Sequence, residues 1–528
     1  MSKKISSSTA EPHAKRKHPS PAISKLLLFF TVTLSGGSVM ILELLGTRII
    51  APYYGVSLYV WSSLIAVTMI ALALGYYLGG FLADRYQRIR LAHIFILAAL
   101  ATVLIPFISG SVMHLTNPLG IRLGAFASAL ILFTLPLTLL AMVGPFVIKL
   151  ATQNLHDVGT ASGSVYAVST VGSVIATLML GFYLLPVFGT RSIIFALSLM
   201  LLVLAVLLML RDKHGFTRPF SSLPVMFSAV LVGILAANGH ARAAHPQLVR
   251  GFQVQHEEES IYGWVRVVDD QLNGSRLLLS DASVLSAVSL ANGQTLLGYQ
   301  AIIGQLPLYR PAAKNALLVG LGGGHIARDF KSKGLATDTI EIDPAVADAS
   351  LKYFQFKPTG EFIVGDARYE IQKLNKRYDF IIEDCFTGGA EPTHLLTIEM
   401  LRQLRGLLSE QGILVLNYAG FTEGEGADAV ASVYKTLKQV LPNIQVFVTE
   451  KKEFADFIFV ASNQELVLDR SSQDPRIQWL LGHEYAWNNT AGIVITDDYN
   501  PMESMQVRKS ETYRKVFMER IAEELLVL

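Results

Sequence analysis

The second half of the chain carries several residues whose types and spacing suit the binding of a nucleoside. A glycine loop, with Gly320, Gly322 and Gly324 as its candidate contacts, follows an apolar run and lets the backbone approach a ligand closely. Glu341 ends the next apolar run, where a carboxylate can accept hydrogen bonds from both hydroxyls of a ribose. Asp343 lies two residues further and could share that role.

Two more acids follow the next two apolar runs. Asp366, with Ala367, is placed to meet the amino group of an adenine, and Asp384 directly follows the run "YDFIIE". The glycine loop reads GLGGGH, so it has neither the G-x-G-x-x-G spacing of a dinucleotide fold nor the Lys-Ser/Thr pair of a triphosphate loop. Together the residues predict a nucleoside site, although each one alone could equally be a polar surface residue.

The elements that must position these residues alternate between strands and helices. From 313 to 528 the pattern predicts a Rossmann-like α/β domain with a mainly parallel sheet, whose last two strands pair antiparallel. Ligands in such sheets bind beyond the carboxyl ends of the strands. Residues 251–312 predict a small β-hairpin cap and a connecting helix, because "GWVRVVDD" and "SRLLLSD" flank a turn at Asn273-Gly274.

The first half of the chain has the composition of a membrane domain. Hydrophobic residues make up 51% of the 528 residues and charged residues only 16%, against about 25% charged in an average soluble protein. Residues 1–24 predict a disordered basic tail. Residues 25–240 predict about seven apolar helices, each able to cross a ~30 Å hydrocarbon core, over 25–47, 58–82, 91–112, 123–148, 160–187, 191–210 and 222–239.

Charges in the loops predict the orientation of these helices, because cytoplasmic loops are enriched in Lys and Arg. With the amino terminus inside, the outer loops hold only Arg48, Arg122 and Arg191, and the other Lys and Arg residues before His240 lie inside. We therefore expect a multi-pass protein of a bacterial inner membrane, with the lipid bilayer as partner and a cytoplasmic amino terminus. We also expect the soluble half in the cytoplasm, because the nucleoside that it is predicted to bind would be made there, although seven crossings would place it outside.

Several longer motifs resemble the spermidine synthase family, within the class I S-adenosylmethionine-dependent fold. "EID" at 341–343, "GDA" at 365–367 and "YDFIIED" at 378–384 follow in the family's order, and "GYQAIIGQLPL" matches its segment before the nucleotide domain. "PTHLLTIEML" and "LSGGSVMILELLGTRIIAPYYG" look like the bacterial subgroup that is fused to a membrane domain. The resemblance implies a donor that is S-adenosylmethionine or its decarboxylated form, an amine acceptor, and no metal.

The resemblance also implies roles for three side chains. Asp384 would orient the attacking nucleophile and accept its proton, and Tyr299 would close over the donor or acceptor. His394 could act as a base near neutral pH, or lie in a helix start that only packs. The family's aminopropyltransferases carry Asp at two positions where this chain has Gly323 and Thr387. Both differences weaken the case for a cationic donor and a diamine acceptor, because each ammonium would lose a carboxylate partner.

Three functions from different classes remain open. The first is a membrane-bound transferase that moves an aminopropyl group onto a polyamine. The second is an S-adenosylmethionine-dependent methyltransferase that acts on a small or membrane-embedded acceptor. The third is a transporter or sensor that binds a nucleoside or polyamine without turnover. The net charge of +2 argues against a nucleic-acid partner, and the sequence leaves homo-oligomerisation open.

Overall fold

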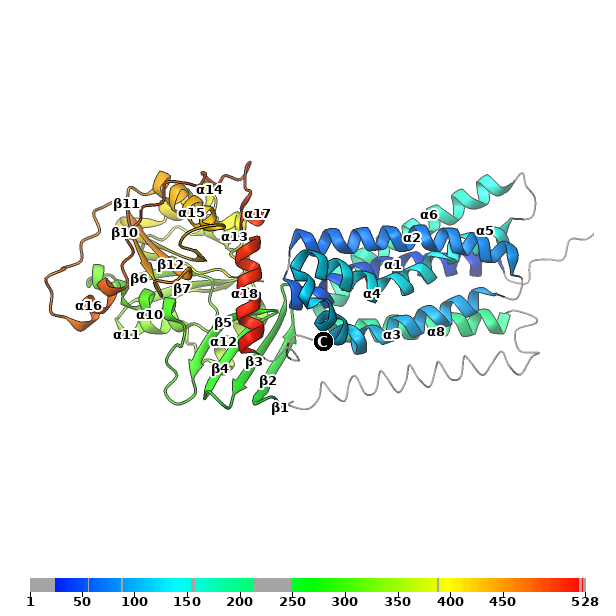
Figure 1. The fold of residues 1–528 in the computed structure, drawn as a ribbon, viewed down its shortest axis with the longest axis horizontal. Helices are drawn as coiled ribbons and strands as arrows, with labels where there is room; N and C mark the ends of the chain where they lie inside the picture. The colour runs from blue at the N-terminus through cyan, green and yellow to red at the C-terminus, as the bar shows by residue number, and fades with distance from the viewer. Residues whose placement is uncertain are drawn as a thin grey trace, which may run out of the picture.

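A computed structural model describes residues 24–55, 57–86, 89–152, 157–211, 248–386, 389–521 and 525. In these ranges the chain forms a bundle of long helices and, at one end of it, an α/β half (Figure 1). The predicted tail, apart from Ser24, and the predicted helix over 222–239 lie outside the described residues.

The bundle consists of apolar helices, as the composition predicts. Five segments of the described residues are long and apolar enough to cross a membrane, and one of them, Leu91–Ala151, contains two of the predicted stretches because α3 and α4 turn back on each other. The helices are α1 Lys25–Tyr54, α2 Leu58–Arg85, α3 Leu91–Thr116, α4 Gly120–Ala141, α5 Val143–Ala151, α6 Val158–Met179, α7 Leu185–Val187 and α8 Thr190–Arg211.

Small residues allow these helices to pack closely. A Cβ atom added to Gly172 of α6 would lie 2.4 Å from the carbonyl oxygen of Thr33 on α1. One added to Gly75 of α2 would lie 2.5 Å from the carbonyl oxygen of Thr138 on α4. Such contacts between backbones are typical of helix interfaces in membranes, where glycine removes the side chain that would keep the helices apart.

The two ends of the bundle differ in what they contact. At one end, the Tyr53 carbonyl accepts from the Arg514 Nε at 2.7 Å, and Glu259 accepts from the Thr190 backbone N–H at 2.7 Å. At the other end, Lys149 pairs with Asp84 at 2.9 Å. Because α1 begins at the second end and finishes at the first, Lys25 and the α/β half lie at opposite ends of the bundle (Figure 1).

The β-cap is larger than the predicted hairpin. Five strands form an antiparallel sheet in sequence order, and the predicted turn at Asn273-Gly274 joins the third strand to the fourth. The helix α10 then leads into the next domain. The bounds are β1 Leu248–Val249, β2 Phe252–Glu259, β3 Trp264–Asp270, β4 Ser275–Ser280, β5 Ser283–Ser289 and α10 Gly298–Gln305.

The predicted α/β domain is confirmed. Its seven-stranded sheet has the order β11-β12-β10-β9-β6-β7-β8, and only β12 runs antiparallel to its neighbours. The strands are β6 Asn315–Val319, β7 Ala336–Glu341, β8 Phe362–Val364, β9 Tyr378–Glu383, β10 Leu408–Phe421, β11 Asn443–Val448 and β12 Phe454–Ser462.

Helices cover both faces of this sheet, and two apolar clusters fill the space between them and the strands. The helices are α11 His325–Ser332, α12 Pro344–Tyr353, α13 Ala367–Glu370, α14 Ile398–Gly406, α15 Ala427–Val440, α16 Pro475–Gly482, α17 Met502–Met505 and α18 Val507–Arg520. The last helix, α18, lies between the sheet domain and the bundle (Figure 1). This position makes it the roof of the site described next.

Candidate functional site

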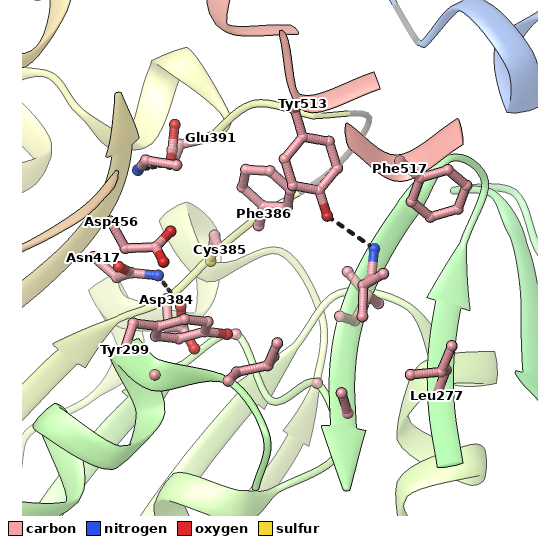
Figure 2. A pocket seen from close by; sticks show the side chains of 18 of the residues that line it. Leu277, Tyr299, Asp384, Cys385, Phe386, Glu391, Asn417, Asp456, Tyr513 and Phe517 are labelled. Atoms are coloured by element: carbon pink, nitrogen blue, oxygen red, sulfur yellow. Dashed lines mark hydrogen bonds between the residues drawn. The ribbon is translucent and has the colours of Figure 1, made fainter. Parts of the chain in front are cut away.

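A cavity of about 1030 Å³ opens at the carboxyl ends of the parallel strands. Its walls come from the ends of β6, β7 and β9, from the β-cap, and from α18. Figure 2 shows polar side chains on one side of it and aromatic and aliphatic side chains on the other. Eight of the site residues predicted from the sequence line this cavity: Tyr299, Gly320, Gly322, Glu341, Asp366, Ala367, Asp384 and His394.

The glycine loop and Glu341 form one wall of the cavity. Gly320 has φ +89°, and a Cβ atom there would lie 2.3 Å from the Asp384 carbonyl oxygen, so only glycine fits. Glu341 is buried at the end of β7 and accepts the backbone N–H groups of Leu321 and Asp343, both at 3.0 Å. Burial raises the pKa of Glu341, while these two bonds oppose that shift. Backbone hydrogen bonds therefore hold the Glu341 carboxylate in place beside the glycine loop, which carries no side chain at Gly320.

The remaining predicted donor contacts divide into two groups. Gly322, Asp366 and Ala367 line the cavity, and the Asp366 carboxylate also caps α13. Asp343 and Gly324 do not line it. Asp343 caps α12 and accepts from Ser260 Oγ at 2.8 Å, and a Cβ on Gly324 would meet the Phe356 ring at 2.5 Å. These two residues position the loops that carry the others.

Asp384 lies at the centre of a polar cluster. Asn417 of β10 donates to Asp384 Oδ1 at 2.9 Å, and Tyr299 of α10 lies beside the same carboxylate (Figure 2). Burial raises the pKa of Asp384 to about 7, against the opposing effect of these two hydrogen bonds. A carboxylate with this pKa can hold or release a proton near neutral pH, which is what a general base requires.

A second carboxylate, Asp456 of β12, faces the same point of the cavity (Figure 2). Burial raises its pKa to about 6, and its negative charge in turn raises the pKa of Asp384. Sequence reasoning missed Asp456 because it lies inside a strand. The available signal was a single acid in the otherwise apolar run "FADFIFVAS". The two acids and the Tyr299 hydroxyl make a place for a cationic or proton-donating group.

His394 also lines the cavity, after the end of β9. Burial lowers the pKa of its imidazole, so the ring is neutral at physiological pH. Its carbonyl oxygen accepts from Arg368 Nη1 at 2.6 Å, which ties the segment to α13. A neutral imidazole in this position can accept a proton, and it can equally serve as a wall of the donor site.

Helix α18 is held over the cavity by a buried ion pair that the sequence did not reveal. Lys509 of α18 donates to the Glu391 carboxylate, and its ammonium lies 3.8 Å from the centre of the Tyr418 ring. Glu391 also accepts the Ala419 backbone N–H at 2.9 Å. Further along α18, the hydroxyl of Tyr513 accepts the Val284 backbone N–H at 3.0 Å and so joins the helix to the β-cap.

Neighbouring side chains occupy the space beside Gly323, the position at which the similar aminopropyltransferases carry their first Asp. The Gly323 backbone N–H donates to Ser286 Oγ at 2.8 Å. A Cβ atom on Gly323 would lie 2.7 Å from His325 Cε1 and 2.8 Å from the same Oγ. A carboxylate side chain there would need both neighbours to move. The second position, Thr387, lies outside the described residues.

Comparison with known proteins identifies relatives of the α/β half. Residues 296–464 match the family model of the Spermine/spermidine synthase domain. The chain is 30% identical over 233 residues to an N-terminal histidine N-methyltransferase from Emericella nidulans, covering 40% of this chain and 41% of that protein. It is 34% identical over 139 residues to a polyamine aminopropyltransferase from Vibrio vulnificus, covering 25% and 45%.

A third similar protein is a thermospermine synthase from Arabidopsis thaliana. It is 24% identical over 276 residues, which cover 49% of this chain and 79% of that protein. The chain spans less than half the length of the first two relatives. The likeness to these two proteins therefore covers only part of each.

Proposed function

Because residues 296–464 form a spermidine synthase-like domain, we propose that the chain is a transferase that moves an aminopropyl group from decarboxylated S-adenosylmethionine to an amine. The donor nucleoside would lie along the glycine loop, with its ribose hydroxyls donating to Glu341 and its adenine near Asp366 and Ala367. Relatives named as a polyamine aminopropyltransferase and a thermospermine synthase support this assignment.

The observation that carries the proposal is the pair of carboxylates around Tyr299. Asp384 and Asp456 both lie close enough to Tyr299 to raise the pKa of its hydroxyl, after the larger effect of burial. An amine that reaches this point arrives as an ammonium, which two carboxylates attract. The family's two missing Asp residues would each have bound an ammonium, and Asp456 supplies a carboxylate from a different strand.

The reaction needs alignment and the removal of one proton. The ammonium first loses a proton, and the freed nitrogen lone pair then attacks the carbon next to the sulfonium. The C–S bond breaks, its electron pair stays on sulfur as a neutral thioether, and the product leaves as a secondary ammonium. The proton that the nitrogen loses passes to Asp384, whose raised pKa makes it a stronger base than an exposed carboxylate. Tyr299, beside this carboxylate, restricts the reactants to a geometry in which attack can occur.

Methyl transfer is the second candidate, and one observation favours it. The side chains of Ser286 and His325 occupy the space beside Gly323 where an ammonium-binding carboxylate would have to lie. S-adenosylmethionine has a carboxylate on the same chain as its ammonium and depends less on that contact. The Emericella nidulans relative is named as a methyltransferase.

Donor preference separates the two candidates. Calorimetry on the full-length protein should show tighter binding of decarboxylated S-adenosylmethionine than of S-adenosylmethionine. Incubation with 1,3-diaminopropane should then give a product whose mass has increased by one aminopropyl group. Tighter binding of the carboxylated donor, with a product heavier by one methyl group, would replace the first candidate by the second.

We further propose that the bundle spans a bacterial inner membrane with the amino-terminal end of α1 in the cytoplasm. The loops at that end hold most of the positive charge, whereas Arg48, Arg122 and Arg191 belong to the end that contacts the α/β half. Lys25 and the α/β half lie at opposite ends of the bundle. A bundle that spans the membrane with this orientation would put the α/β half outside, so the proposal replaces the expected cytoplasmic placement of that half.

Reporter fusions test this orientation. Alkaline phosphatase fused after Arg250 should be active and β-galactosidase at the same point inactive, because only the phosphatase folds outside the cytoplasm. A fusion after Arg85, at the opposite end of the bundle, should give the reverse pattern. Active β-galactosidase after Arg250 would overturn the outward placement. With the outward placement, the donor must be delivered across the membrane.

A further inference from the structure

The cavity has an apolar end that the donor nucleoside does not use. The donor contacts proposed above lie along Gly320, Glu341 and Asp366, and Ile342 and Leu395 lie nearby as apolar walls for a base. On the other side of the cavity from Asp456, a group of the lining side chains is aliphatic or aromatic, as Figure 2 shows for Leu277 and Phe517, although Asn273, Ser275 and Arg520 also line the cavity. The set consists of Phe252, Leu277, Val284, Val516, Phe517 and Ile521.

The apolar end is continuous with the helix bundle. Phe252, Phe517 and Ile521 are buried and belong to the same apolar cluster as the core of the bundle, with Leu277 and Val284 packed against it. The helix α18 makes the connection, because Phe517 and Ile521 face the cavity while Arg514 contacts the end of α1. The cavity therefore extends from the carboxylates toward the end of the bundle.

A short polyamine would not use this end well. Its second ammonium would lie among apolar side chains, and burying a charge without a partner is costly. Asp270, which is opposite Phe252 in the β-cap sheet, also lines the cavity, but it already accepts hydrogen bonds from the backbone N–H groups of Leu272 and Asn273 and from Asn273 Nδ2, at 3.0, 3.1 and 2.6 Å. An apolar chain, in contrast, gains free energy there in proportion to the area that it buries.

We propose that the acceptor is an amine attached to an apolar chain: the nitrogen lies between Asp384 and Asp456, and the chain lies along Leu277 and Phe517 toward the bundle. The proposal rests on the proposed transferase function and narrows its acceptor class. Chemistry at the nitrogen is unchanged: a C–N bond forms, the C–S bond of the sulfonium breaks, and the proton passes to a carboxylate. An amphiphile of this kind would enter from the surface of a membrane.

A matched pair of acceptors tests the proposal on the full-length protein. 1,3-Diaminopropane and N-hexyl-1,3-diaminopropane share one primary amine and a second nitrogen three carbons away, and they differ by a hexyl chain on that second nitrogen. We expect kcat/KM to be at least about tenfold higher for the hexyl compound, because six carbons are removed from water. The measurement uses whichever donor the protein binds, with the product detected by mass.

Two cavity variants and one control locate the effect. Leu277→Gln and Val516→Gln should each reduce the preference for the hexyl compound to about threefold or less, since a polar amide replaces an apolar contact. The preference is the ratio of the two kcat/KM values, so a general loss of activity in a variant does not change it. Leu272→Gln, whose side chain is 79% exposed and does not line the cavity, should leave the preference unchanged. Because two cavity variants are made, the test remains valid if one of them fails to fold.

The outcomes separate this proposal from the function on which it rests. Equal kcat/KM values for the two amines, or a preference for the shorter one, would overturn the apolar acceptor and leave the transferase intact. A preference that survives both cavity variants would also overturn it, because the chain would then bind elsewhere. Donor binding without transfer to either amine would refute the transferase function itself.

Discussion

The two sides of the cavity are built differently. On the proposed donor side, Gly320, Glu341 and Asp366 lie at or just after the carboxyl end of a strand of the parallel sheet, and backbone groups hold the loop and the carboxylate in place. On the proposed acceptor side, Tyr299, Asp456 and α18 come from distant segments, and Tyr299 and α18 are more than two hundred residues apart. A donor site that is fixed by the fold can be inherited widely, whereas an acceptor site assembled from distant segments can change its specificity without disturbing the sheet.

The largest effect is expected at Asp384, where the donor and acceptor sides of the cavity meet, and it separates donor binding from catalysis. Asp384→Asn keeps the shape of the side chain and its contact with Asn417 but removes the base. We expect turnover to fall about a hundredfold, as the loss of a proton-transfer group does, while donor affinity by calorimetry stays unchanged. Asp348→Asn, an acid of α12 outside the cavity, is the control. Equal losses in affinity and turnover would make Asp384 a donor contact instead.

The next prediction concerns the donor side alone. Glu341→Ala should weaken donor binding at least about tenfold, because charge-assisted hydrogen bonds contribute ~1.5–3 kcal/mol each. Glu361→Ala, an exposed acid just before β8, should bind the donor normally. Thermal unfolding should show that both variants are folded. If calorimetry gives the same affinity for the Ala variant as for the natural chain, the ribose lies elsewhere.

The sequence predicts the donor side better than the acceptor side for a physical reason. Strand ends can be recognised from apolar runs, and acids that follow them meet at one edge of the sheet. Asp343 and Gly324 satisfied the same pattern but serve as a helix cap and a packing position, which spacing alone does not distinguish. Asp456 and Lys509 reach the site through tertiary packing, so their positions depend on contacts that local patterns do not encode.

The fold shows a similar division. The alternation of strands and helices was sufficient to predict the α/β domain and its antiparallel last pair. The β-cap was underestimated, because β2 and β5 carry too few apolar alternations to be recognised as strands of a five-stranded sheet. Hydropathy located the bundle helices, yet it contains no information on which end of the bundle the α/β half contacts.

A smaller effect should distinguish the two carboxylates of the acceptor side. Activity should be lost as the pH falls through about 7, because Asp384 must be ionised to take the proton. Asp456→Asn removes a negative charge that raises the pKa of Asp384, so the acidic limb of the pH–rate profile should move to lower pH. The KM for the amine should rise about fivefold through the lost ionic contact. If neither the acidic limb of the pH–rate profile nor the KM for the amine changes, Asp456 does not belong to the acceptor site.

The smallest expected effect tests whether the bundle influences the acceptor side at all. Arg514 of α18 donates to the Tyr53 carbonyl at 2.7 Å and to Asn117 Oδ1 at 2.6 Å, and its guanidinium lies 4.5 Å from the centre of the Tyr54 ring. These contacts hold α18 against the bundle, while Phe517, one turn further along, lines the cavity. Arg514→Ala should therefore loosen the apolar wall without touching the donor side.

For Arg514→Ala we expect about a threefold rise in KM for an acceptor with an apolar chain, the size that follows from losing a cation–π contact, and an unchanged donor affinity. Lys515→Ala, the exposed neighbour on the same helix, should change neither quantity. Thermal unfolding of both variants shows whether the fold survives, and Arg514→Lys, which keeps the charge, should restore part of the acceptor affinity. If donor affinity falls together with acceptor affinity, the two sides of the cavity are not independent, because α18 would then position both.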